Sequence, residues 1–299
     1  MINRVTQQTM QRSTLANMQA NLARTADLQA RMSSGKTITK PSDDPAGAAR
    51  SMALRSDQAA ANQATRNADD GITWLGTTDD AMQASITALR SARDLVVQAA
   101  SSGSVGTQSR EAIATAIDGI KSSLLDLANT TIQGRPVFAG TTSDGVAFDG
   151  GTSATPYAWH GVAGATVDRR VSPNATVRVD TDGTAAFGQG ANSVFALLDN
   201  ISADLRGTAE VSPRLAEVDT KLNGMLSQVA NVGIRYKQVD DAKNTIAAKV
   251  QATTSSISGI ENIDLAETIM ELNMQQVSYQ GALGAAAKVL QPTLMDFLR

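Results

Sequence analysis

The residues Gly35-Lys36-Thr37 have the types that close a phosphate-binding loop. In that motif an earlier glycine opens the loop and a strand precedes it, so that backbone N–H groups can surround a phosphate. Here position 30 is Ala30, and the residues before it follow helical rather than strand spacing. The spacing therefore excludes a phosphate loop, and Gly35 is better suited to end a helix in the left-handed conformation.

Asp43 and Asp44 stand side by side before Pro45, and two carboxylates could begin a metal site. No further carboxylate follows at ligand spacing, however. An aspartate before a proline also starts a helix, because its carboxylate accepts the first free N–H groups and proline fits the first turn. We therefore expect one of the two aspartates to cap a helix from Pro45, while Pro41 keeps the preceding connector extended.

The middle of the chain holds the remaining candidates for an enzyme site: Asp149, His160, Asp168 and Asp180. His160 is the only histidine and the chain has no cysteine, so neither a zinc site nor a catalytic triad is indicated. The run from Asp180 to Gly183 is too short for a calcium loop and predicts a hairpin turn. No spacing among these residues meets a chemical requirement. We predict no catalytic residue, no metal and no cofactor, and hence a protein that is not an enzyme.

Composition favours helices packed along thin seams. Of 299 residues, 42% are apolar but only 3% are aromatic. The net charge of −3 argues against a nucleic-acid-binding protein, which normally carries a basic face. No apolar run is long enough to span a membrane, and residues 1–11 lack the apolar core of a cleavable signal peptide. The absence of cysteine fits a reducing cytosol and equally a protein exported unfolded.

The last forty residues, 260–299, predict an amphipathic helix that needs a partner. Asp264 and Glu267 form a capping box at its start. A coiled-coil seam of alternating spacings of three and four follows: Ile269, Leu272, Gln276, Tyr279, Leu283, Ala286 and Leu290. Further apolar residues close the chain: Leu294, Phe297 and Leu298. Fully burying one leucine is worth about 1.5–3 kcal/mol, so a partner surface is implied, and we expect Gln276 to set the register.

The N-terminal residues 2–33 predict a similar helix. Its apolar stripe is sparse: Leu15, Met18, Leu22, Leu28 and Met32. From composition alone a marginal helix or a disordered tail is the alternative. Because both ends carry thin stripes, we expect the two terminal helices to pair, with breaks at Gly35 and Gly259 separating them from the rest.

Between these arms the periodicity predicts a long antiparallel helical rod, a coiled-coil-like bundle. Helical spacing is lost between residues 136 and 190, where glycine, threonine, serine and valine dominate. The predicted fold is therefore mainly α, with paired terminal helices and a small inserted β-rich domain. Its parts are an N-terminal arm (1–40), the first half of the rod (41–135), the β-rich domain (136–190), the second half of the rod (191–259) and a C-terminal arm (260–299).

Several of these segments resemble a known family. Ser34-Gly35-Lys36 and the run Pro41-Ser42-Asp43-Asp44-Pro45-Ala46-Gly47 are similar to the signature after the first helix of bacterial flagellins and their junction relatives. The Pro-Ser-Asp-Asp-Pro form is closer to the junction relatives. Ile260-Glu261 and the closing residues 294–298 resemble the C-terminal arm of that group. The resemblance is specific over residues 1–100 and 210–299, and between them it rests on Gly134 to Gly140.

The resemblance implies a structural axial protein of the bacterial flagellum, outside the cell, which joins a hook-side junction protein to the flagellin filament. The alternatives are a flagellin itself and, from periodicity alone, a cytosolic coiled-coil signalling protein. The implied partners are copies of itself in a ring, flagellin, the hook-side hook-associated protein, and an export chaperone on the C-terminal arm. Type III export of the unfolded chain, without a cleavable signal, is also implied.

Two sets of residues are expected to carry this role. Subunit contacts are expected at Leu15, Met18, Leu22, Leu28, Ile269, Leu272, Leu283, Leu290, Leu294, Phe297 and Leu298. The angle between arm and rod is expected to depend on Gly35, Pro41, Asp43, Asp44, Pro45 and Gly259.

Overall fold

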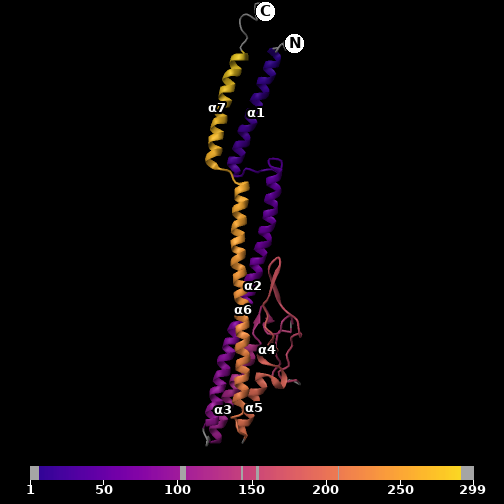
Figure 1. Cartoon of the computed structure of the whole chain (residues 1–299), viewed down its shortest axis with the longest axis vertical. Helices are drawn as coiled ribbons and strands as arrows, with labels where there is room; N and C mark the ends of the chain where they lie inside the picture. The colour runs from indigo at the N-terminus through magenta and orange to yellow at the C-terminus, as the bar shows by residue number, and fades with distance from the viewer. Residues whose placement is uncertain (1–6, 102–105, 143, 153–154, 208, 291–299) are drawn as a thin grey trace, which may run out of the picture. The chain divides into compact units, whose positions relative to one another are not determined.

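The computed structural model of the chain describes residues 7–101, 106–142, 144–152, 155–207 and 209–290. Within these ranges it is mainly α, as the sequence predicts (Figure 1). The helices are α1 (Gln7–Ser34), α2 (Pro45–Ser101), α3 (Thr107–Ala128), α4 (Gly183–Phe187), α5 (Val194–Arg206), α6 (Arg214–Glu261) and α7 (Leu265–Leu290), with a 3-10 turn, η1, at Gly190–Asn192. No helix in the described part combines the length and hydropathy needed to cross a membrane.

The chain forms two compact units. Unit 1 consists of residues from Met1–Ala60 and Val250–Arg299, and unit 2 consists of Ala61–Lys249. Because α2 and α6 each cross these boundaries, both helices contribute residues to both units.

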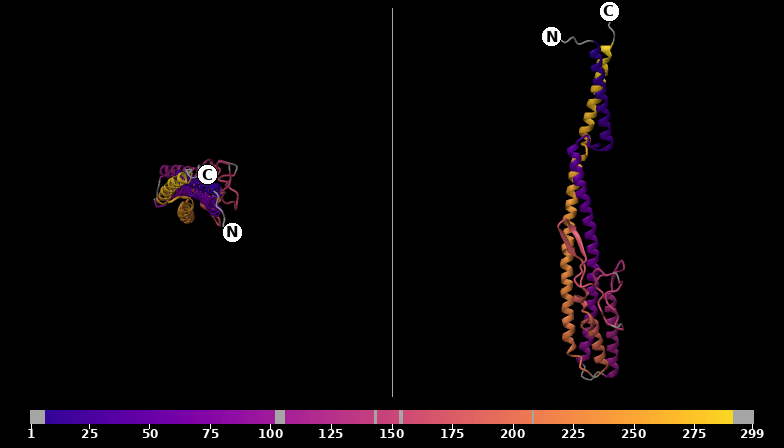
Figure 2. Two further views of the ribbon diagram at one scale, coloured as in Figure 1. Left: turned by 90° about the horizontal axis from the view of Figure 1, so that it is seen from above. Right: turned by 90° about the vertical axis from the view of Figure 1, so that its right-hand side faces the viewer.

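Unit 1 is built on the antiparallel pair of α1 and α7, which lie side by side in Figure 1 and in the right-hand view of Figure 2. The pairing of the terminal helices is thus as expected. The side chains at the interface recur at spacings of three and four, and we call this row the seam. It comprises Met18, Asn21, Thr25 and Leu28 of α1 with Thr268, Leu272, Gln275, Tyr279, Ala282 and Ala286 of α7, all buried or half-buried.

The phase predicted for α7 was partly wrong. Leu272, Tyr279 and Ala286 lie in the seam, but Ile269, Gln276 and Leu283 lie on its exposed flank. The residue that sets a polar contact across the seam is Gln275, whose amide nitrogen lies 3.4 Å from the backbone oxygen of Asn21 and 3.3 Å from its side-chain oxygen. The helix also carries apolar side chains opposite the seam, so apolarity alone could not fix its phase.

The connector between α1 and α2 is held by local hydrogen bonds. Gly35 ends α1 with φ +68°. Asp43 accepts hydrogen bonds from the backbone N–H groups of Thr39 and Lys40, at 3.1 and 2.8 Å. Asp44 caps α2, because its Oδ1 accepts from the N–H groups of residues 46 and 47 at 3.1 and 2.9 Å. Capping from this aspartate pair is as predicted, and the two carboxylates have separate tasks.

The second break lies later than predicted. Helix α6 continues through Gly259 to Glu261, and α7 starts only at Leu265. Asp264 supplies the start signal, since its Oδ1 accepts from the N–H groups of Ala266 and Glu267 at 2.9 and 3.2 Å. An unstrained helical glycine does not by itself end a helix. The capping aspartate decides where the next one begins.

Unit 2 has its core among α2, α3, α5 and α6. Apolar residues that recur at helical spacing along α2 are buried: Leu75, Met82, Ile86, Leu89 and Val96. Ile117 and Leu124 of α3 belong to the same core, and α3 packs against α5. Helix α5 begins at the capping residue Ser193, whose hydroxyl accepts from the N–H of Ala196 at 3.1 Å.

Between residues 131 and 189 the described residues form two pairs of short strands and the short helix α4. The strands are β1 (Thr131–Ile132) with β2 (Arg135–Pro136), and β3 (Asp168–Ser172) with β4 (Ala175–Arg178), each pair antiparallel. A cluster of aromatic rings packs this region: Phe138, Phe148, Tyr157, Phe187 and Phe195, with neighbouring centroids 5.1–5.8 Å apart. The hairpin turn predicted at Asp182-Gly183 was wrong. Asp182 instead caps α4, accepting from the N–H of Thr184 at 2.8 Å.

Candidate functional site: the Glu261 cluster and the paired terminal helices

Glu261, the last residue of α6, binds three side chains from other parts of unit 1. Arg55 of α2 donates from Nε to Oε1 at 2.9 Å and from Nη2 to Oε2 at 2.6 Å. Lys36 of the connector donates to Oε2 at 3.1 Å, and the Ser51 hydroxyl donates to Oε1. We call Lys36, Ser51, Arg55 and Glu261 the Glu261 cluster.

The electrostatics of the cluster favour the ionised carboxylate. Only 10% of the Glu261 side chain is exposed, and this burial alone would favour the neutral acid. The hydrogen bonds from Arg55 and Ser51 outweigh it, with a smaller contribution from Lys36, and lower the pKa of Glu261 from 4.5 to about 2. The carboxylate therefore stays charged at any physiological pH.

Backbone hydrogen bonds continue the cluster into both connectors. The N–H of Thr37 donates to the carbonyl of Glu261 at 2.6 Å, and the N–H of Ile263 donates to the carbonyl of Gly35 at 3.2 Å. Lys36 and Asn262 form an isolated antiparallel bridge. The break after α1 and the break before α7 are thus tied to each other and to α2. This arrangement fixes where the terminal helices leave the ends of α2 and α6 in unit 1.

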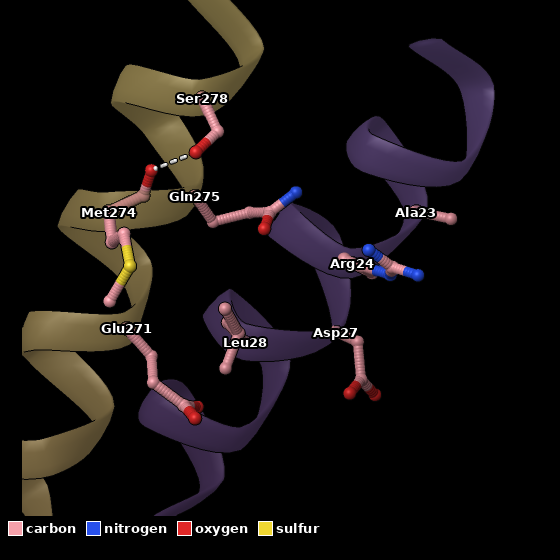
Figure 3. A pocket seen from close by; sticks show the side chains of 8 residues that line it. All are labelled: Ala23, Arg24, Asp27, Leu28, Glu271, Met274, Gln275 and Ser278. Carbon is pink, nitrogen blue, oxygen red and sulfur yellow. Dashed lines mark hydrogen bonds between the residues drawn. The ribbon is translucent and has the colours of Figure 1, made fainter. Parts of the chain in front are cut away.

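A surface groove of about 590 Å³ lies between α1 and α7. The groove is lined by residues of both helices, and Figure 3 shows Leu28 of α1 and Gln275 of α7 projecting into the space between them. Charged side chains line the rim, and Asp27 forms an ion pair with Arg31 at 2.9 Å. The groove shows that the pairing of these two helices leaves part of their facing surfaces uncovered.

Large apolar side chains stand in solvent on the outer faces of the same pair. On α1 these are Leu15 (61% exposed) and Leu22 (55%). On α7 Met270 and Val277, 63% and 68% exposed, lie opposite the seam, and Met274, 66% exposed, lines the groove. A helix that is apolar on all sides is normally buried on all sides. Unit 1 therefore has an incomplete surface that a further chain could cover.

The structure separates the predicted contact residues into several groups. Leu272 is buried in the seam, and Met18 and Leu28 are half-buried there. Ile269 and Leu283 are each 41% exposed and, like Leu15 and Leu22, are accessible to a partner. Helix α7 includes Leu290, whose side chain lies outside the described residues, as do Leu294, Phe297 and Leu298.

The candidates for catalysis have structural partners. His160 Nε2 lies 2.8 Å from Asp149 Oδ1. Asp180 is buried, binds Arg178 at 2.9 and 2.8 Å, and accepts from the N–H of Val167. Asp168 accepts from the hydroxyl of Thr166 at 2.8 Å. Within the described ranges no three histidine, cysteine or acidic side chains lie where they could hold one metal ion.

Sequence reasoning missed the roles of Ser51, Arg55 and Lys36 in the Glu261 cluster. Ser51 and Arg55 are four residues apart and so share one face of α2, which was a usable signal. Their partner is 210 and 206 residues away, however, and no local pattern identifies it.

Two family models match this chain. The model of the bacterial flagellin N-terminal helical region matches residues 5–143, and that of the C-terminal helical region matches residues 215–298. Both of the breaks joined by the Glu261 cluster fall within the matched segments.

Individual relatives agree. Flagellar hook-associated protein 3 of Escherichia coli is 27% identical over 281 residues, spanning 85% of this chain and 86% of its own. A flagellin of Bacillus subtilis is 27% identical over 295 residues, spanning 93% of each chain. A solved structure of a flagellar hook-associated protein from Vibrio parahaemolyticus covers 74% of this chain and 100% of its own, with a TM-score of 0.67 and 20% identity. That last likeness concerns the fold alone.

Proposed function

Since the chain belongs to the bacterial flagellin family, we propose that it is the structural axial protein that joins the hook to the flagellin filament. Two relatives named flagellar hook-associated protein 3, from Escherichia coli and Salmonella typhimurium, match over most of both chains and support this position. The role is structural and requires neither a catalytic residue nor a cofactor. The protein acts outside the cell, in the flagellum.

The observation that carries the proposal is the incomplete surface of the terminal pair. Leu15 and Leu22 on α1, and Met270, Met274 and Val277 on α7, expose apolar area that burial against neighbours would stabilise by about 25 cal/mol per Å². Copies of the same chain in a ring would cover part of it. Flagellin on one side and the hook-side hook-associated protein on the other would cover the rest.

The same faces need cover before assembly. An export chaperone bound to α7 and the residues after it would keep the apolar side chains from aggregating. The chain would then cross the export channel unfolded. A sequence without cysteine suits this route, because no disulfide can form before the chain reaches its site.

A second candidate function is flagellin itself, favoured by the match to the Bacillus subtilis flagellin over 93% of each chain. Labelling isolated flagella with an antibody against this chain separates the two. A junction protein is expected in one narrow band at the hook–filament boundary. Label along the whole filament would instead identify a flagellin, and absence of label from the flagellum would refute both.

A further inference from the structure

We propose that a basic groove beside the Glu261 cluster receives the acidic first turns of α7 from a neighbouring copy of this chain. The inference rests on the proposed function, since it names one contact by which assembled copies hold each other. The basic groove is lined by Lys36, Ile38, Thr39, Lys40, Pro41, Ala48, Ser51, Met52, Arg55 and Glu261, and its volume is about 220 Å³.

The charges lining the groove do not balance. Lys36 and Arg55 share the single carboxylate of Glu261, and their side chains are 45% and 53% exposed. Lys40 adds a third cation, and its ammonium group forms no ion pair among the described residues. Asp43 lies outside the lining but attracts Lys40, whose backbone N–H donates to its carboxylate at 2.8 Å. The lining itself carries three cations against the single anion of Glu261, which favours a carboxylate from outside.

The groove also has an apolar side. Met52, which is 62% exposed, and Ile38 both line it. The volume of the basic groove is smaller than that of pockets that bury drug-sized ligands. The groove therefore fits single side chains that project from a neighbouring surface. The preferred occupant therefore presents carboxylates and flexible apolar side chains together.

The start of α7 has this composition. Glu267 and Glu271 are four residues apart on one helix face, are exposed, and form no ion pair in the described part of the chain. Met270 and Met274 lie beside them and are 63% and 66% exposed. Methionine is unbranched and flexible, so it adapts its shape to an irregular partner surface.

Within one copy these surfaces do not meet through any ion pair among the described residues. In Figure 3 Glu271 and Met274 lie beside the groove between α1 and α7. A neighbouring copy can supply the partner instead. A contact between two different patches is heterologous, and such contacts repeat from copy to copy, forming a ring where the rotation closes and an open helix where it does not. The inferred contact is thus of the head-to-tail kind that a ring uses.

The test uses the absence of cysteine from the chain. Two full-length variants, Lys40→Cys and Glu267→Cys, are expressed together, and the flagella are isolated and oxidised gently. The contact predicts a disulfide-linked dimer that contains one copy of each variant. Each variant expressed alone, and Lys40→Cys paired with Gln276→Cys on the exposed flank of α7, are expected to give no more than about a tenth of that yield.

Incorporation is scored separately by antibody labelling at the hook–filament boundary. Variants that are incorporated without the mixed dimer would overturn this inference and leave the proposed function standing. Wild-type chain absent from the boundary would instead refute the proposed function.

If the cysteine variants are not incorporated, charge-reversal variants test the same contact. Lys40→Glu is expected to reduce incorporation about tenfold, and adding Glu267→Lys to the same chain is expected to restore most of it. Losses that simply add together would overturn the inference. The yield of the mixed dimer at different salt concentrations gives a third measurement. It should fall as the salt concentration rises, because a contact between surface charges weakens once the Debye length falls below about 10 Å.

Discussion

Arg55 and Glu261, which are 206 residues apart in the chain, form a two-point ion pair with distances of 2.9 and 2.6 Å. The pair joins the start of α2 to the last residue of α6, and Lys36 brings the first connector to the same carboxylate. In this position it stabilises the two breaks from which the terminal helices depart. Two-point arginine–carboxylate pairs also restrict geometry, since both groups are planar.

Replacing Glu261 by glutamine is expected to loosen both connectors. The variant leaves Arg55 and Lys36 without their anion and removes at least one charged hydrogen bond, so the connectors should open more often. Hydrogen exchange at the amides of Thr37 and Ile263 should become about tenfold faster. Glu210→Gln, at an exposed site in unit 2, is the matched control, and equal exchange in both variants would contradict a special role for Glu261.

Acid should have the same effect as that substitution. The folded-state pKa of Glu261, about 2, lies below its ordinary value of 4.5. Its contribution to stability is therefore complete above pH 4.5 and is lost as the pH falls toward 2. The difference in urea midpoint between wild type and Glu261→Gln should shrink steadily across that window. A difference that stays constant from pH 6 to about 2 would show that Glu261 is not held as described.

Helix α7 provides a matched pair of neighbouring glutamines, one in the seam and one on its exposed flank. Gln275→Ala removes the hydrogen bonds to Asn21 and should destabilise the terminal pair by about 0.5–1.5 kcal/mol. Gln276→Ala changes an exposed flank and should stay within about 0.5 kcal/mol. Hydrogen exchange along α7 measures the change in stability in each of the two variants. A larger effect at position 276 would favour the register predicted from the sequence over the one in the structure.

The sequence predicts the boundaries of several helices but not the face of α7 that packs against α1. The helix boundaries were accessible because their signals are local: Gly35 with its positive φ, Asp44 before Pro45, and Ser193 before α5. The phase of α7 was not accessible, because leucine and methionine occur on several of its faces. Its seam instead uses Thr268, Gln275 and small alanines, which a hydrophobic pattern ranks low.

The site was less predictable than the fold. The Glu261 cluster joins residues 206–225 positions apart, and only their meeting in space gives them a common role. The prediction of a hairpin turn at Asp182 was wrong for a related reason. The same aspartate-glycine pair serves a hairpin or a helix cap, and the packing of Phe187 in the aromatic cluster favours the short helix α4.

Two leucines of α7 should separate folding from assembly. Leu272 is 7% exposed in the seam, so Leu272→Ala should weaken the free terminal pair by about 2 kcal/mol. Leu283 is 41% exposed, so Leu283→Asp should leave the circular dichroism of the monomer unchanged and block filament attachment in cells. Asn273→Asp, which adds the same charge at an exposed polar site, is the control. Normal filaments on cells carrying Leu283→Asp would count against an assembly role for this flank.

The central claim is that α1 and α7 form a surface that only neighbouring subunits complete. The most direct measurement is hydrogen exchange of both helices in the purified monomer and in isolated flagella that contain the protein. The account predicts that their amides exchange at least about a hundredfold more slowly in the flagella, because exposed residues such as Leu15 and Met274 become buried. Equal protection in the monomer and in the flagella would contradict it.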